Sequence, residues 1–149
     1  MISIDEILDV AVAPAAVFAV LTRVERYCFW VPALKESIAL PGAADGSAGS
    51  RFSVRFAGPM GMLQATGTVT GAEPPRSLTL EATGGVFRLT GACDLEPTPT
   101  GTRLHVLANA ELLGMARFVE GMARDRLAAA LPDGRVALQA AIEREAAAG

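Results

Sequence analysis

The chain has 149 residues, of which 51% are hydrophobic and 19% charged, and its formal net charge is -3. This length is typical of one domain and this composition of a folded globular protein, so we expect a single domain over residues 1–149. The arginines are scattered singly along an acidic chain. That distribution excludes the basic stripe that binding to nucleic acid requires.

The N-terminal stretch MISIDEILDVAVAP contains acids and lacks a basic region before an apolar core, so it is not a secretory signal. No apolar run is long enough to span a bilayer without a charge, proline or glycine in it. We therefore expect a cytoplasmic protein without a transmembrane segment, in which any membrane contact is transient. Cys28 and Cys93 fit no CxxC spacing, which favours two reduced, buried thiols over a disulfide.

The first elements are predicted to be a strand and two short helices. ISIDEILDVAV alternates as a strand, with Leu8, Val10 and Val12 on one face. Pro14 ends that strand and suits the first position of a helix, PAAVFAVLTRV, whose apolar residues recur at helical spacing. A second short helix is expected to begin near Pro32, followed by a strand around Ser37 to Leu40.

The middle of the chain is predicted to be an antiparallel meander. RFSVRFA alternates strictly, with Phe52, Val54 and Phe56 on one face and Arg51, Ser53 and Arg55 on the other. LQATGTVT and SLTLEAT repeat this alternation on either side of a Pro-Pro turn. VFRLTGACDLEP and TRLHVLANAEL add two more strands, joined by the turn TPTG.

The C-terminal part changes to a helical period. MARFVEGMARDRLAAAL and GRVALQAAIEREAA predict one long helix that begins between Gly114 and Arg117. Pro132 and Gly134 predict a kink or short break within it. An open sheet with one apolar face must cover that face, and only this helix is long enough to do so.

With this order of elements the chain resembles the START-like or SRPBCC superfamily, and within it the polyketide cyclase/dehydrase group and the relatives of the G-type subunit of carbon monoxide dehydrogenase. The resemblance rests on VAPAAVFAVLTRVERYCFWVPAL, EPPRSLTLEA, GTRLHVLANAEL and ARFVEGMARDRLAAAL, and it covers nearly the whole chain. It implies an α+β helix-grip fold, in which a curved antiparallel sheet of six or seven strands wraps around the long C-terminal helix.

Three aromatic residues, Tyr27, Phe29 and Trp30, gather at one bend beside Pro32. If the helices at 14–35 close one end of the sheet, these side chains fill that end. Packing is the favoured role for Trp30, and contact with a ligand is the alternative.

The sequence offers little support for a catalytic or metal site. His105 is the single histidine, and with two distant cysteines it makes a poor zinc site, so we expect no metal. A GxSxG elbow and a P-loop are both missing, and we expect no cofactor. Arg55, His105 and Glu111 are the polar candidates for acid–base chemistry, against the simpler interpretation of solvated strand faces.

The composition of the last helix points to a cavity, because that helix is rich in alanine and glycine and would underfill the curved sheet. Closer approach of the helix to the sheet is the alternative. Met115, Phe118 and Met122 share one helical face and are expected to point at Phe56, Phe87 and Leu89. The predicted ligand-binding residues are Trp30, Phe52, Phe56, Phe87, Leu89, Met115, Phe118 and Met122.

Two functions follow from the resemblance. The first is binding of a hydrophobic small molecule, such as a lipid, a prenylated quinone or a polyketide-like compound, between the sheet and the helix. The second is a polyketide cyclase or dehydratase activity that uses Arg55, His105 or Glu111 in the same cavity. The first is favoured because most polar residues alternate onto the strand face opposite the phenylalanines.

Overall fold

The computed structural model describes residues 2–23, 25–26, 34–41, 47–58 and 61–148. Seven strands form one antiparallel sheet in the order β1-β7-β6-β5-β4-β3-β2. Consecutive strands from β2 to β7 are neighbours, and β1 returns to pair with β7, which is the meander expected from the alternation. The strands are β1 (Ile2–Val10), β2 (Leu34–Leu40), β3 (Arg51–Gly58), β4 (Gly61–Glu73), β5 (Ser77–Gly84), β6 (Phe87–Thr98) and β7 (Gly101–Leu112).

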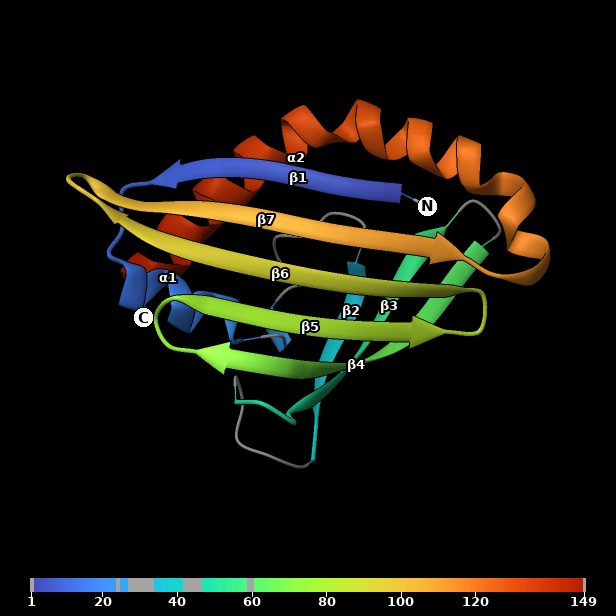
Figure 1. Cartoon of the computed structure of the whole chain (residues 1–149), viewed down its shortest axis with the longest axis horizontal. Helices are drawn as coiled ribbons and strands as arrows, with labels where there is room; N and C mark the ends of the chain where they lie inside the picture. The colour runs from blue at the N-terminus through green and yellow to red at the C-terminus, as the bar shows by residue number, and fades with distance from the viewer. Residues whose placement is uncertain (1, 24, 27–33, 42–46, 59–60, 149) are drawn as a thin grey trace.

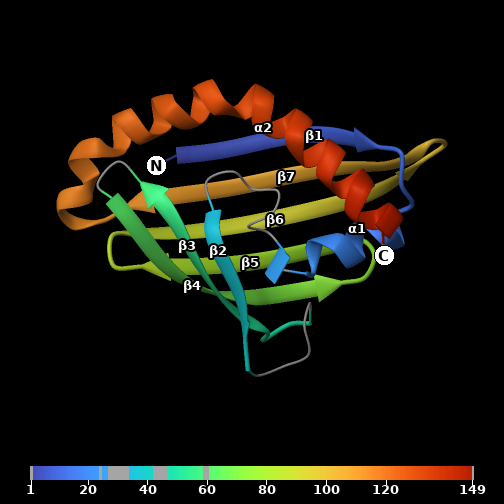
Figure 2. The same ribbon diagram turned by 180° about the vertical axis from the view of Figure 1, so that it is seen from behind.

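The helices lie on one side of this sheet. They are α1 (Pro14–Leu21), the 3-10 helix η2 (Gly114–Val119) and α2 (Glu120–Ala148). Figure 1 shows the sheet strongly curved, with β2, β3 and the first part of β4 crossing the direction of the other strands, and α2 arching along β1. Seen from behind in Figure 2, α1 and the C-terminal end of α2 lie in front of the sheet. We call the face that they cover the concave face.

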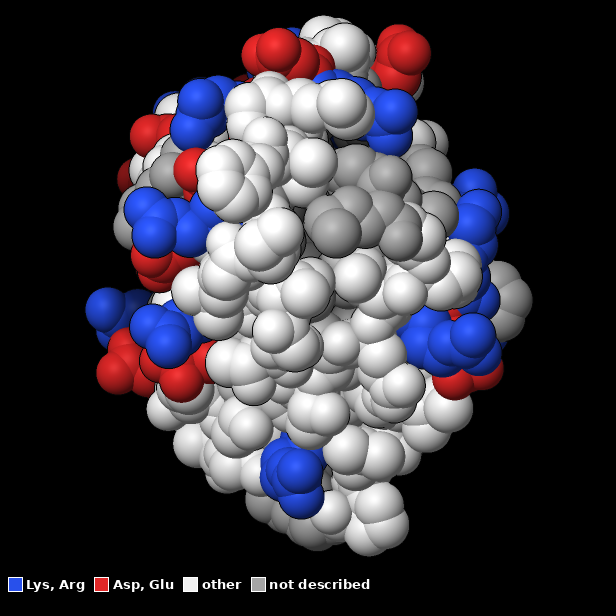
Figure 3. Space-filling model, turned by 90° about the vertical axis from the view of Figure 1, so that its right-hand side faces the viewer, with Lys and Arg blue, Asp and Glu red and all other residues white. Residues whose placement is uncertain are grey.

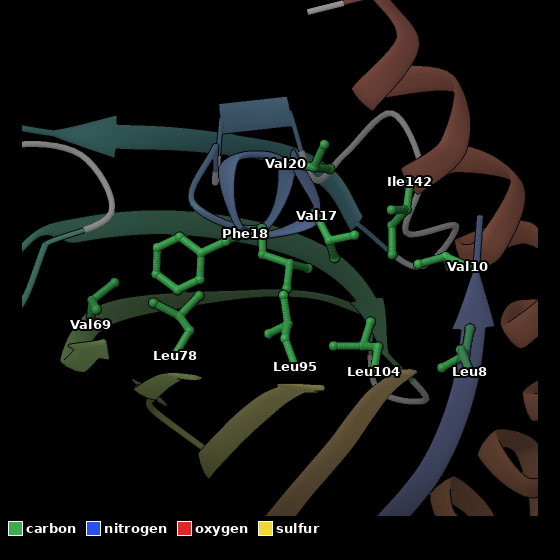
Figure 4. Packing of buried hydrophobic residues seen from close by; sticks show 11 residues of the cluster. Leu8, Val10, Val17, Phe18, Val20, Val69, Leu78, Leu95, Leu104 and Ile142 are labelled. Atoms are coloured by element: carbon green, nitrogen blue, oxygen red, sulfur yellow. The ribbon is translucent and has the colours of Figure 1, made fainter. Parts of the chain in front are cut away.

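The main core lies between the concave face and the two helices. Val17 and Phe18 of α1 and Ile142 of α2 are buried against strand residues (Figure 4). The strand side chains that point at them come from β1, β4, β5, β6 and β7, and they are Leu8, Val10, Val69, Leu78, Leu95 and Leu104. Burial of this many aliphatic side chains, at about 25 cal/mol per Å² of apolar area, is the main term that holds α1 and the end of α2 in place.

The C-terminal helix differs in two ways from the sequence prediction. Helical structure begins at Gly114, inside the predicted interval, but the first six residues are 3-10 and the α-helix starts only at Glu120. Gly114 has a φ of 58°, a left-handed conformation that glycine adopts without strain as the chain leaves β7. Of the predicted kink or short break at Pro132, the break is not found, because α2 is continuous through that residue; its ribbon curves over the sheet (Figure 2). A helix bends at an internal proline rather than ending there when both halves stay in register.

The segment after β1 also differs from the prediction of two short helices. Among the described residues one α-helix follows β1, and β2 begins at Leu34, three residues before the expected Ser37. The second helix was expected near Pro32, and that position lies outside the described residues, as do Tyr27, Phe29 and Trp30. The residues from Leu34 onward form strand β2 because they pair with β3, from Leu34 opposite Phe56 to Leu40 opposite Arg51.

Candidate functional site

A second apolar cluster occupies the concave face at the end of the sheet away from α1. Phe52, Val54, Ala65, Ala82 and Phe87 are buried there, and all of them come from strands. The rings of Phe56 and Phe87 meet edge to face, with centroids 5.2 Å apart and an interplanar angle of 78°. This geometry is favourable for aromatic pairs and adds to the stabilisation from burial. Phe56 and Leu89, both half-buried, pack against the buried residues.

Small side chains line the middle of the concave face, between the two clusters, and we call this part of the sheet the floor. In each antiparallel pair, residues directly opposite one another share a face. Ala108 lies opposite Gly91, and Ala110 opposite Leu89, so both alanines lie on the concave face with the second cluster. Gly67 lies opposite both Phe52 and Ala82 on the same face. Because these side chains are short, they project little from the sheet in the middle of the concave face.

This floor is not fully covered. Val106, Ala108 and Ala110 point to the side of the sheet that the helices occupy, yet they remain half-buried. The helix α2 comes close to β1, α1 and η2, and it does not approach the central strands as closely. Solvent therefore reaches part of an apolar surface that in an ordinary two-layer domain would be sealed by a helix.

The helix α2 is held mainly by its C-terminal third. Ile142 is fully buried in the main core, and the backbone N–H of Ala11 donates to Glu143 Oε2 at 3.2 Å. Arg26 donates to both carboxylate oxygens of Glu145, at 2.8 and 3.1 Å, and this pairing lowers the pKa of Glu145. Nearer the middle of α2, Arg135 Nη1 lies 3.2 Å from Glu6 Oε2.

Glu6 was not singled out from the sequence, although a signal for it existed. It lies opposite Val106 in the register of β1 and β7, so it shares the concave face with Leu8 and Val10. Side chains two residues apart in a strand lie on the same face, so Glu6 points inward because Leu8 does. It is half-buried, and its partner is Arg135.

The three polar candidates lie on the other, convex face of the sheet. Arg55 is exposed and lies opposite Gln64, on the face away from Phe52 and Phe56. His105 Nε2 lies 2.6 Å from Asp5 Oδ1 of the neighbouring strand β1. Glu111 is exposed on the same side of β7 as His105. The structure therefore does not bring Arg55, His105 and Glu111 together with the apolar candidates.

The apolar candidates divide into two groups. Phe52, Phe56, Phe87 and Leu89 come together in the second cluster. Met115, Phe118 and Met122 were expected to pack against that cluster, but they are exposed. Trp30 lies outside the described residues. The helical spacing predicted one shared face for these three residues, but spacing alone does not say whether such a face meets the sheet or the solvent.

Cys93 also lies on the concave face, opposite Val106 and Leu78. Burial, and secondly the neighbouring charge of Asp94, raise the pKa of its thiol to about 11. A thiol with so high a pKa is almost entirely protonated at neutral pH and is a poor nucleophile and metal ligand. Within the described ranges, His, Cys, Asp and Glu side chains form no group of three that would hold a metal ion.

These features define a class of protein: an α+β helix-grip domain whose curved sheet presents a partly open apolar face to a long C-terminal helix. Residues 1–143 match the model of the family described as polyketide cyclase/dehydrase and lipid transport. The chain belongs to this family, which is the polyketide cyclase/dehydrase group that the sequence resemblance indicated. None of the curated proteins compared with the chain matched it in sequence.

Solved structures agree with the fold. A START superfamily protein from Mycobacterium smegmatis is 16% identical with a TM-score of 0.76, over 95% of this chain and 97% of that one. The Zhui aromatase/cyclase from Streptomyces sp. R1128 is 16% identical with a TM-score of 0.72, over 97% of this chain and 92% of that one. Ara h 8.0201 is 14% identical with a TM-score of 0.66, over 94% of this chain and 96% of that one. Identities this low show a shared fold and no more.

Among the described residues, no helix is both long enough and apolar enough to pass through a bilayer.

Proposed function

We propose that the protein binds a hydrophobic small molecule, of the lipid, prenylated quinone or polyketide-like class, on the concave face beneath α2. The observation that supports this most directly is the partial exposure of Val106, Ala108 and Ala110 on a face that the helices should cover. Burying apolar surface that is in contact with water lowers the free energy. An apolar ligand can bury this surface while the C-terminal end of α2 stays in place. The family, which includes lipid transport, fits this function.

A cyclase or dehydratase activity is the second candidate, and the family description includes it. Such chemistry needs acid–base groups beside the bound substrate. The candidates named from the sequence are on the convex face. On the concave face, Glu6 is already paired with Arg135, and burial raises the pKa of the Cys93 thiol to about 11. Binding is therefore better supported than catalysis.

The experiment that tests the proposed function combines identification of a ligand with a matched pair of variants. Native mass spectrometry of the purified protein should detect a co-purified apolar molecule. Ala108→Trp should fill the open floor and weaken binding of an apolar fluorescent probe, 1-anilinonaphthalene-8-sulfonate, by about tenfold or more. Thr90→Trp places the same side chain on the exposed convex face of the adjacent strand and should leave probe binding unchanged.

Two outcomes would count against this function. The first is wild-type protein that neither carries an apolar molecule nor binds the probe. The second is equal loss of binding in Ala108→Trp and Thr90→Trp, since the probe would then not sit on the concave face.

A further inference from the structure

The end of the molecule formed by η2 and the start of α2 exposes large apolar side chains. Phe118 is 86% exposed, Met115 78% and Met122 51%. These three residues form what we call the apolar tip. The other four phenylalanines with a described burial are all buried or half-buried, so an almost fully exposed ring is unusual among them. Exposed apolar side chains gathered in one place indicate an interaction surface.

The shape and position of the apolar tip suit insertion into a soft surface. In Figure 1 η2 and the first turns of α2 form one extremity of the molecule. Figure 3 looks at that end and shows a broad uncharged surface bordered by both basic (Lys, Arg) and acidic (Asp, Glu) side chains. Met62, at the start of β4, is a further exposed apolar residue, with 51% of its surface accessible. A projecting apolar surface can enter the headgroup region of a bilayer without the rest of the protein being desolvated.

The charges around the apolar tip indicate what kind of surface it meets. Residues 114–126 contain three arginines and two acids, which is a net charge of +1 in a chain whose net charge is -3. One of the acids, Glu120, has Arg124 Nη2 at 3.9 Å from its carboxylate. Arg117 is exposed between Met115 and Phe118, so a cation accompanies the apolar side chains wherever they bind. The arginines are Arg117, Arg124 and Arg126, and the acids are Glu120 and Asp125.

From these observations we propose that the apolar tip docks the protein onto a membrane surface that contains anionic lipids. Phe118 and Met115 insert among the headgroups, and Arg117 pairs with lipid phosphates. A second copy of the chain is a poorer occupant, because both copies would bring a segment with the same net charge of +1 into the contact. The docking requires no bound ligand and is independent of the binding function proposed above.

The test is co-sedimentation of the full chain with vesicles of phosphatidylcholine, alone or mixed with phosphatidylglycerol. The protein should bind the mixed vesicles more tightly, and high salt should weaken this binding. Phe118→Ser should reduce the partition coefficient about tenfold, and Arg117→Gln about fivefold. Matched controls are Ile7→Ser and Ile38→Ser, which remove exposed apolar side chains (54% and 46% accessible) from the sheet, and they should bind as wild type does.

The proposal is overturned if wild-type protein ignores both vesicle types, or if Ile7→Ser and Phe118→Ser lose binding equally. It is also overturned if sedimentation velocity shows a dimer that Phe118→Ser dissociates, since the apolar tip would then be a contact between copies. The loss of probe binding in Ala108→Trp, measured without vesicles, reports on the concave face, whereas Phe118→Ser reports on the apolar tip, so the two proposals can fail separately.

Discussion

The ring of Phe52 lies directly over Gly67 on the neighbouring strand. The two residues are opposite each other in the register of β3 and β4, and a Cβ on Gly67 would overlap the Phe52 ring. Glycine therefore leaves room for the Phe52 ring close to the neighbouring strand. Gly84 stands in a similar relation to Phe87, whose ring carbon would be 2.7 Å from an added Cβ. The aromatic residues of the concave face thus depend on glycines across the strands.

Because of this contact, Gly67→Ala tests whether Phe52 packs closely over Gly67 in the second cluster. The added methyl group should force Phe52 from its position and lower the free energy of unfolding by about 1–3 kcal/mol. Gly91→Ala is the matched control, because its Cβ would meet Leu80 at 3.5 Å, an ordinary van der Waals contact. That variant should be unchanged or more stable by up to about 1 kcal/mol. Urea denaturation measures both, and equal effects would contradict the packing described here.

The anchoring of α2 predicts very different costs for two substitutions in the same helix. Ile142→Ala removes a fully buried side chain and should lower the free energy of unfolding by about 2–5 kcal/mol. Val136→Ala, only two turns earlier but 68% exposed, should change it by about 0.5 kcal/mol or less. A large effect of Val136→Ala in chemical denaturation would mean that this part of α2 packs against the sheet.

The same anchoring predicts a gradient of hydrogen exchange along α2. Amides near Ile142 should be protected most strongly, because opening them exposes the main core. Amides in the exposed part that begins at Gly121 should exchange faster. Exchange monitored by mass spectrometry resolves the two regions, and uniform protection would contradict the prediction. An apolar ligand beneath α2 should slow exchange in the first half of the helix.

Acid should weaken the contact between Arg26 and Glu145. The hydrogen bond from Arg26 lowers the pKa of Glu145 below its ordinary value near 4.5. The pair therefore contributes its full stability above the pKa of the unfolded carboxyl group, and that contribution disappears as the pH falls through the lower pKa of the folded state. Glu145→Gln should be less stable at neutral pH and should lose less stability than wild type between about pH 6 and pH 3. Parallel pH profiles for the two proteins, measured by urea denaturation, would show that the ion pair contributes nothing.

The thiol of Cys93 should be unreactive in the folded protein. A rise in pKa from 9.0 to about 11 lowers the fraction of thiolate at neutral pH about a hundredfold. Alkylation by iodoacetamide, followed at the peptide that contains Cys93, should therefore be slow in buffer and fast in denaturant. Equal rates in the two conditions would show that this thiol is not held in the apolar environment of the concave face.

Much of the sheet was predictable because a strand's faces follow from a period of two. The pattern in RFSVRFA correctly separated Phe52 and Phe56 from Arg55, and the β6–β7 hairpin was correctly expected from its proline and glycine turn. The inward direction of Glu6 followed from the same rule but was overlooked, since an acid is not expected on an apolar face. The covering of the sheet by the C-terminal helix was correctly expected, but the extent of that covering was not.

The sequence by itself determined the order of the strands along the chain, the alternation of side chains between the two faces of each strand, and the family, because these depend on local periods and on motifs in a fixed order. Tertiary structure alone decided where the last helix makes its contacts. Met115, Phe118 and Met122 have the same helical spacing whether they meet the sheet or the solvent. The choice is made by distant contacts, namely the burial of Ile142 in the main core and the ion pair of Glu145 with Arg26. Because those contacts hold the far end of α2 against β1 and α1, the beginning of the helix is left away from the central strands, and its apolar side chains stay exposed.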